Sequence, residues 1–253
     1  LGDAALKCFK KMQNEGICPD AVTYICILKA CSIVGSLEIG EDIDAEVRKL
    51  GLLQKDIALG NTLLDMYAKC GALEKAQAIF EELPAQDVVS WNALMTGYAQ
   101  VGQSNVVLDL FQKMRAECIV PDSITFLVLL TSCTHAGLFE EGEKLFDDMC
   151  FVFSFNPELE HCTCMIDLFC RAGHFDEAKF FLGKVDSSHY LSILLVFMGA
   201  CTKWGNVNLG RWAFEQALQL DAKRGVAYVG MENIYVAAAM HTEADGIEVL
   251  REE

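Results

Sequence analysis

A run of fifteen residues decides the fold: Ile57-Ala-Leu-Gly-Asn-Thr-Leu-Leu-Asp-Met-Tyr-Ala-Lys-Cys-Gly71. Leu63 and Leu64 stand at its seventh and eighth places, within apolar residues that recur with the period of a helix. Gly71 stands at the fifteenth place, and glycine readily adopts the left-handed conformation that ends a helix. The run therefore predicts a helix of about fourteen residues that stops at Gly71.

The same pattern recurs along the chain. The glycines that match Gly71 are separated by 36, 31, 35, 36 and 32 residues, and they are Gly35, Gly71, Gly102, Gly137, Gly173 and Gly205. Each glycine is followed by a second stretch with one apolar face, and in three of these a phenylalanine stands nine residues after the glycine, at Phe80, Phe111 and Phe146. A repeat of this length with two amphipathic stretches predicts a hairpin of two helices in each unit.

These units divide the whole chain. We predict the second helix of a truncated repeat at 1–20, repeats at 21–56, 57–87, 88–122, 123–158 and 159–190, and two more degenerate units at 191–224 and 225–253. A single hairpin cannot bury both of its faces, whereas a stack of hairpins can. The sequence therefore predicts an all-α, right-handed superhelical solenoid.

Composition excludes two other classes of protein. Hydrophobic residues make up 53% of the 253 residues and charged residues 22%, which excludes a disordered chain. The most apolar run, 190–201, is shorter than the roughly 20 residues that a membrane span needs. We therefore expect no membrane contact.

The twelve cysteines are not arranged as a metal or redox motif, because no C-x-x-C is present. We expect them to be reduced and mostly buried; Cys31, Cys133 and Cys201 share the eleventh place of their units. A closer group could imitate a metal site, namely His161, Cys162, Cys164 and Cys170. On a helix two of these thiols would point to different faces, so we expect neither a metal nor another cofactor.

Several stretches resemble the pentatricopeptide repeat proteins of plant organelles. They are Leu64-Asp-Met-Tyr-Ala-Lys-Cys-Gly71, Asp87-Val-Val-Ser-Trp-Asn92 and Met165-Ile-Asp-Leu-Phe-Cys-Arg-Ala-Gly173. The alternating unit lengths are similar to those of the PLS subclass. The last two units resemble the E-type extension motifs of its editing-factor branch, which are similar to tetratricopeptide hairpins and contact proteins.

The resemblance implies that the chain binds single-stranded RNA, one base to a unit, read by the fifth and last residues of the unit. Those places hold Asn61 with Asp87, and Asn92 with Asp122. In this family the Asn/Asp combination implies uridine, with some tolerance of cytidine, so two adjacent units should prefer U-U. The alternative role for both asparagines is local bonding to the backbone of their own helix.

Other units depart from this pattern. Ile25 and Leu127 put apolar residues at the fifth place. Thr163 has a hydroxyl there, and we include it as a weaker base-reading candidate, although its unit ends at Tyr190.

A polar residue also recurs at the thirteenth place, as Lys69, Gln100, His135, Arg171 and Lys203. We predict phosphate contacts for the three cations, Lys69, Arg171 and Lys203. The alternative is the ordinary preference for cations at the end of a helix.

The resemblance further implies a site-recognition factor for C-to-U RNA editing in a mitochondrion or chloroplast, with editing-complex proteins as further partners. No targeting segment is visible at the start of the chain. We expect no enzymatic activity, because the only H-x-E, at His241–Glu243, lacks the downstream P-C-x-x-C of a zinc deaminase.

Charge supports an alternative function. The net charge is −16, which should repel RNA, and an acidic tetratricopeptide-like scaffold for proteins would tolerate it. Many of the acids fall in the predicted second helices, where they would form the outer layer of a solenoid; they are Glu38, Glu41, Glu74, Glu81, Glu140, Glu141, Asp147, Asp176 and Glu177.

Overall fold

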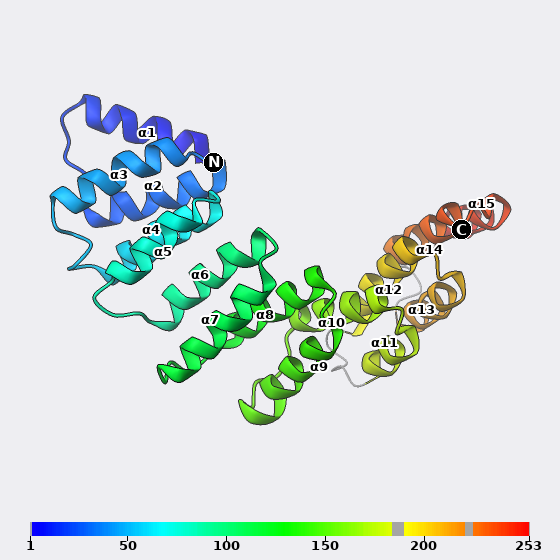
Figure 1. Ribbon diagram of the computed structural model, residues 1–253. Coiled ribbons are helices and arrows are strands. Elements are labelled where there is room, and N and C mark those ends of the chain that lie inside the picture. The colour runs from blue at the N-terminus through cyan, green and yellow to red at the C-terminus, as the bar shows by residue number, and fades with distance from the viewer. Residues whose placement is uncertain (1, 184–189, 221–224, 253) are drawn as a thin grey trace. The chain divides into compact units, whose positions relative to one another are not determined.

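The computed structural model describes residues 2–183, 190–220 and 225–252, and within them it contains α-helices, one π-helical turn and no strand (Figure 1). The expectation of an all-α chain is confirmed. The chain divides into two compact units, Leu1–Ser132 and Cys133–Glu253. Each is described separately below.

The first unit is a series of helical hairpins. Its helices are α1 (Gly2–Asn14), α2 (Ala21–Val34), α3 (Leu37–Lys49), α4 (Ile57–Lys69), α5 (Leu73–Glu82), α6 (Val88–Gln100), α7 (Ser104–Ala116) and the start of α8 (Ser123–Ala136). In Figure 1 they run from blue through cyan to green.

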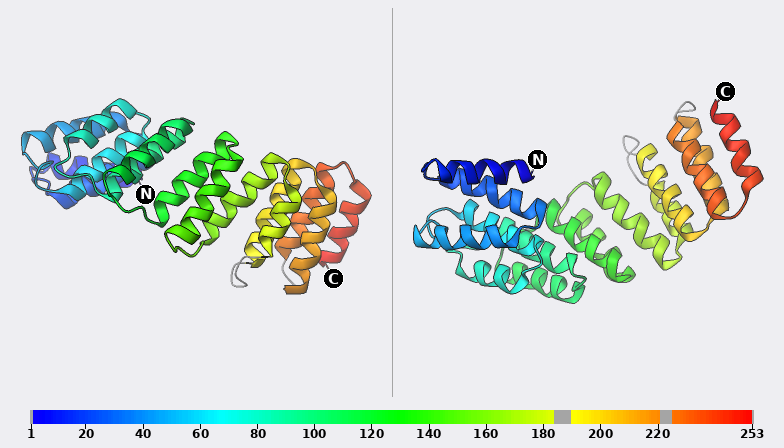
Figure 2. Two further views of the ribbon diagram at one scale, coloured as in Figure 1. Left: turned by 60° about the horizontal axis from the view of Figure 1, so that its bottom comes forward. Right: turned by 90° about the horizontal axis from the view of Figure 1, so that it is seen from above.

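The second unit continues the alternation. After the end of α8 it contains α9 (Phe139–Asp147), the π-helical turn η1 (Asp148–Val152), α10 (Leu159–Ala172), α11 (Phe175–Leu182), α12 (Tyr190–Trp204), α13 (Val207–Leu220), α14 (Gly225–Ala237) and α15 (His241–Glu252). Figure 2 shows α12–α15, yellow to red, side by side in antiparallel order. Among the residues described, no helix has both the length and the apolar character needed to cross a bilayer.

We call the even-numbered helices α2 to α14 the first helices. The repeated glycines mark the ends of the first six of them, α2 to α12. All six glycines have left-handed backbone conformations, with φ between 68° and 81°. That confirms the sequence prediction that glycine stops the first helix of each hairpin. The opposite ends of four first helices begin at an aspartate whose carboxylate accepts a backbone N–H three residues on, namely Asp20, Asp56, Asp87 and Asp122.

The first helices form one layer within each unit. In the first unit α2 packs on α4 and α4 on α6, and in the second unit α10 packs on α12 and α12 on α14. The remaining α-helices, which we call the second helices, form another layer, in which α3 and α5 also contact the next first helix along the chain.

Aromatic pairs join neighbouring hairpins of the first unit. The phenylalanine of a second helix meets the aromatic residue in the first turn of the next first helix in an edge-to-face contact. The pairs and their centroid distances are Phe9–Tyr24 (6.5 Å), Phe80–Trp91 (4.8 Å) and Phe111–Phe126 (6.0 Å). The same contact recurs at three junctions, α1–α2, α5–α6 and α7–α8, and gives the helices there a common stacking register.

Gly97 allows α4 and α6 to approach closely. A Cβ atom at this position would lie 2.8 Å from Ala68 Cβ and 3.2 Å from Ala68 Cα. Gly97→Ala should therefore destabilise the first unit by about 1–3 kcal/mol, although alanine favours a helix over glycine. Urea denaturation followed by circular dichroism measures the change.

The matched control is Gly199→Ala, which lies inside α12 and would meet no atom within 4 Å. There only helix propensity changes, so this variant should gain about 0.5–1 kcal/mol. Equal stabilisation by both variants would contradict the close approach of α4 and α6.

The cysteines are less buried than the sequence suggested. All twelve are free thiols, but five are buried, three are half-buried, and four are exposed, at Cys8, Cys18, Cys26 and Cys118. The expectation of a mostly buried set is therefore wrong. It holds for the eleventh place, where burial raises the pKa of the Cys133 and Cys201 thiols to about 12 and that of Cys31 to about 11.

Candidate nucleic-acid interface

Asn61 and Asp87 are joined by hydrogen bonds. Asn61 is the fifth residue of α4, and its Nδ2 lies 3.0 Å from Oδ1 and 3.2 Å from Oδ2 of Asp87, the residue that caps the start of α6. The Asp87 Oδ1 atom also accepts the backbone N–H of Ser90 at 2.9 Å. One carboxylate thus caps a helix and holds the asparagine of the preceding helix.

Asn92 and Asp122 repeat this arrangement one hairpin later. The Asn92 Nδ2 donates to Asp122 Oδ1 at 2.9 Å, and Asp122 caps α8 through the backbone N–H of Thr125 at 2.8 Å. Here the Thr125 hydroxyl also contacts Asn92 Oδ1, at 2.8 Å. Because α4 and α6 are packed neighbours, the two asparagine–aspartate pairs occupy consecutive first helices.

Both asparagines are largely enclosed. Asn61 is 7% and Asn92 6% exposed, whereas Asp87 and Asp122 are half-buried. The amide nitrogens bond to the next helix, so the alternative of local backbone bonding within their own helix is not what the structure shows for these groups. An amide nitrogen has two N–H groups, so one donor remains after the bond to the carboxylate.

The sequence reasoning missed exposed apolar residues at the second place of two first helices. Val89 is 53% exposed and lies one turn before Asn92, while Ile124 is 58% exposed at the same place of the next helix. Residues three apart share a helix face, so Val89 and Asn92 are neighbours on the surface of α6. An apolar residue at the second place, followed by a buried aromatic at the fourth, was a usable signal.

The other base-reading candidate differs in its contacts. Thr163 is half-buried, and its hydroxyl donates to the carbonyl of Leu159 in its own helix at 2.8 Å. Tyr190, predicted to close that repeat, is the first residue of α12, and residues 184–189 lie outside the described part of the chain. The structure therefore does not pair Thr163 as it pairs the two asparagines.

Two of the three phosphate candidates are held in ion pairs. Lys69 Nζ lies 2.8 Å from Asp65 Oδ2, and Arg171 Nε lies 2.8 Å from Asp167 Oδ2, each one turn earlier on the same helix. Lys203 is exposed, with its Nζ 5.3 Å from the centroid of the Trp204 ring. A phosphate at Lys69 or Arg171 would share the cation with an aspartate.

Charge is divided between the two helix layers. The first helices α2 to α14 together carry four acidic and four basic residues. In contrast, α3, α5, α9, α11 and α15 each carry more acids than bases, and all nine acids named above lie in second helices. The second helices thus carry a larger excess of acids than the first helices, although four capping aspartates, Asp20, Asp56, Asp87 and Asp122, add negative charge at the starts of first helices.

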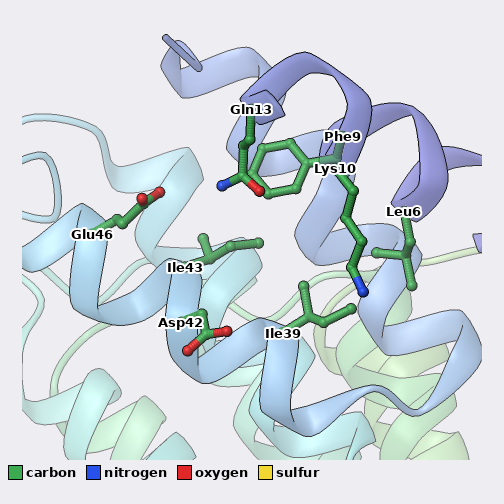
Figure 3. Close-up of a pocket in the computed structure, with 8 residues that line it drawn as sticks. All are labelled: Leu6, Phe9, Lys10, Gln13, Ile39, Asp42, Ile43 and Glu46. Carbon is green, nitrogen blue, oxygen red and sulfur yellow. The ribbon is translucent and has the colours of Figure 1, made fainter. Parts of the chain in front are cut away.

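Two cavities lie apart from these pairs. One of about 330 Å³ in the first unit lies between α1 and α3, with Lys10 from α1 and Asp42 and Glu46 from α3 at its edge (Figure 3). The other cavity, of about 900 Å³, lies in the second unit. Its walls contain phenylalanines and four acidic residues, which come from α9, α10, α11 and the segment that joins α9 to α10. Neither is lined by a predicted base-reading residue.

His161, the first residue of the histidine–cysteine group that resembles a metal site, has a structural role. The His161 ring Nδ1 accepts the backbone N–H of Glu158 at 3.2 Å, which completes a capping box at the start of α10. Cys162 and Cys170 are buried and Cys164 is half-buried. No cluster of three or more potential metal ligands occurs within residues 2–183, 190–220 and 225–252.

Comparison with known proteins identifies the repeat. Models of the pentatricopeptide repeat match residues 7–53 (pentatricopeptide repeat domain), 86–135 (PPR repeat family), and 61–88, 124–150 and 160–188 (PPR repeat). A pentatricopeptide repeat-containing protein of Arabidopsis thaliana is 35% identical over 93% of this chain and 32% of its own length. Another, named as mitochondrial, is 38% identical over 88% of this chain and 29% of its own length. The chain therefore spans about a third of the length of these curated relatives.

Solved structures agree on the fold. The structure of the pentatricopeptide repeat protein PPR10 in complex with an 18-nt psaJ RNA element is similar to this chain, with a TM-score of 0.73 and 20% identity. The alignment covers 99% of this chain and 37% of the PPR10 chain. A further crystal structure of PPR10 from maize covers the same shares of the two chains, with a TM-score of 0.65 and 20% identity. The fold is a solenoid of helical repeats, and the chain belongs to the pentatricopeptide repeat family.

Proposed function

We propose that this chain binds single-stranded RNA and that its two asparagine–aspartate pairs select uridine at two neighbouring nucleotides. The observation that carries the proposal is the repeated hydrogen bond from the asparagine amide to an aspartate at the start of the next first helix. PPR10, which shares the fold, has been solved with a bound RNA.

The chemistry of the pair fits a pyrimidine edge. The carboxylate accepts one N–H of the asparagine and turns the other toward a base in a defined orientation. Uracil offers carbonyl oxygens on its Watson–Crick edge, and an unpaired base exposes that edge to a side chain. Asn61 and Asn92 thus act as donors, and Asp87 and Asp122 position them.

Apolar contact and charge division support the same surface. Val89, one turn before Asn92 in α6, and Ile124, at the same place in α8, are exposed and offer surface on which the face of a base can pack. Within their bounds the first helices carry equal numbers of acids and bases, so apart from their capping aspartates they repel a phosphate backbone less than the acidic second helices would.

We further propose that the chain acts as a site-recognition element for C-to-U RNA editing in an organelle, with the deaminase supplied elsewhere. Relatives of this chain include one named as mitochondrial, which supports a mitochondrial location, with the chloroplast as the other candidate. The alternation of unit lengths and the degenerate last two units support membership of the PLS subclass with E-type motifs, which would contact editing proteins.

The salt dependence of RNA binding tests the phosphate contact of Lys69. For wild type, the logarithm of the RNA-binding constant should fall linearly as the logarithm of salt concentration rises. In Lys69→Gln this dependence should be shallower, with the magnitude of the slope reduced by about 0.7. Fluorescence anisotropy at salt concentrations of about 20–200 mM, where phosphate contacts dominate, gives the slope.

Lys113→Gln is the matched control, because Lys113 is exposed in the second helix α7. Its slope should equal that of wild type, and an equal loss in both variants would remove Lys69 from the interface. If the folded chain bound no RNA at any of these salt concentrations, the acidic scaffold for protein partners would become the better reading.

A further inference from the structure

We infer that Thr125 is a positioning residue that sets base selectivity: it fixes the amide of Asn92, so unit 88–122 discriminates uridine from cytidine more strongly than unit 57–87. This inference rests on the proposed function, because it concerns how the same pairs read RNA. It is carried by a difference between the two otherwise matching sites.

Both ends of the Asn92 amide are held. Its Nδ2 donates to Asp122 Oδ1 at 2.9 Å, and its Oδ1 accepts from the Thr125 hydroxyl at 2.8 Å. The Thr125 side chain is fully buried, and its oxygen accepts the Asp122 backbone N–H at 3.1 Å, which fixes the hydroxyl in place. The Thr125 hydroxyl also lies 2.9 Å from Asp122 Oδ1. Turning the amide over would face its oxygen to the carboxylate and break the bond to Asp122, and the Thr125 hydroxyl would have to donate to Asp122 instead of Asn92.

Only one end of the Asn61 amide is held. The residue that corresponds to Thr125 is Ser90, and its hydroxyl donates to the Asp87 carbonyl at 2.8 Å. Asn61 Oδ1 is buried and has no hydrogen-bond partner within the described part of the chain. Turning this amide over costs the bond to Asp87 but relieves a buried, unpaired acceptor.

The exchange of threonine for serine accounts for the difference. The methyl group of threonine restricts its χ1 rotation, which keeps the Thr125 hydroxyl directed to Asn92. A serine hydroxyl turns more freely to a carbonyl three residues earlier, as Ser90 does. The two sites therefore share an asparagine and an aspartate but differ in how firmly the amide is oriented.

Orientation decides which base fits. A held amide presents an N–H, which pairs with a carbonyl oxygen of uracil. A turned amide presents its oxygen, which pairs with the exocyclic amino group of cytosine or adenine. The Asn61 site should thus tolerate cytidine more readily than the Asn92 site.

Base preference at single nucleotides tests this inference. Anisotropy is measured with RNAs that carry U or C at each position of a fixed sequence, and Asn61→Ala and Asn92→Ala identify the nucleotide that each asparagine reads. Thr125→Val keeps the side-chain shape and removes the hydroxyl. It should lower the U-over-C ratio about three- to tenfold at the Asn92 nucleotide and leave the Asn61 nucleotide unchanged.

Ser90→Thr is the reciprocal variant and should raise the U-over-C ratio at the Asn61 nucleotide about three- to tenfold. Thr23→Val is the control at the same place of unit 21–56, where the Thr23 hydroxyl contacts Asp20 and not an asparagine. It should change neither ratio. Circular dichroism verifies that each variant is folded.

Two failures are distinguishable. If Asn61→Ala and Asn92→Ala change no base preference, the proposed function fails. If they do, but folded Thr125→Val keeps the wild-type ratio, the positioning role of Thr125 is overturned. If Thr125→Val does not fold, the test rests on Ser90→Thr. An unchanged U-over-C ratio at the Asn61 nucleotide in that variant overturns the inference.

Discussion

Asp122→Ala is expected to lower the free energy of unfolding by about 2–4 kcal/mol and to abolish base preference at one nucleotide. Loss of the helix cap of α8 costs about 0.5–2 kcal/mol. The same change leaves the buried Asn92 amide nitrogen without its acceptor, which costs about 1–3 kcal/mol more. Urea denaturation and RNA anisotropy on the same preparation measure both effects.

Two further variants separate the causes. Asp122→Asn retains a side-chain oxygen that can cap α8, so it should lose about 1 kcal/mol or less while it still alters base preference. Asp109→Ala, at an exposed position in the second helix α7, should change stability by about 0.5 kcal/mol at most. A loss in Asp122→Ala no larger than that of the Asp109 control would contradict a double role for this carboxylate.

Trp91→Ala is expected to cost about 3–5 kcal/mol, the largest loss that we predict. Its ring is 2% exposed and packs edge-to-face on Phe80, so it joins the second helix of one hairpin to the first helix of the next. Repeat proteins are stabilised mainly between neighbours, so the variant should also uncouple the hairpins on either side of this junction. Urea unfolding should show a lower midpoint and a broader transition.

Trp204→Ala is the matched control, because the Trp204 ring is 43% exposed in α12. It should lose less than about 1 kcal/mol. A comparable loss in the two tryptophan variants would argue against the aromatic junction as the main contact between these hairpins.

The sequence predicted the hairpins because glycine and apolar residues follow simple local rules. Gly35 and Gly71 stop helices since their conformation is left-handed, and that preference belongs to the residue itself. The pairing of Asn61 with Asp87 was implied by the resemblance to pentatricopeptide repeats, in which the fifth and last residues of a unit read one base. The hydrogen bonds between them are a finding of the structure.

Other features depend on information that spacing does not contain. The different orientations of the Thr125 and Ser90 hydroxyls depend on side-chain rotation inside a packed junction. Cys26 is exposed although it lies in a first helix, because burial depends on the face that its place in the repeat occupies. The ion pair of Lys69 with Asp65 was accessible from the four-residue spacing and was overlooked.

The most direct test of base reading compares wild type with Asn92→Thr on short RNAs that contain U-U in a fixed context, at low salt. The threonine hydroxyl is shorter than the amide and cannot present the same N–H to a pyrimidine. Wild type should prefer U at both nucleotides, and the variant should lose that preference, shifting toward a purine, at one nucleotide while keeping it at the neighbour. RNA binding by both folded proteins with identical base preferences would contradict the account.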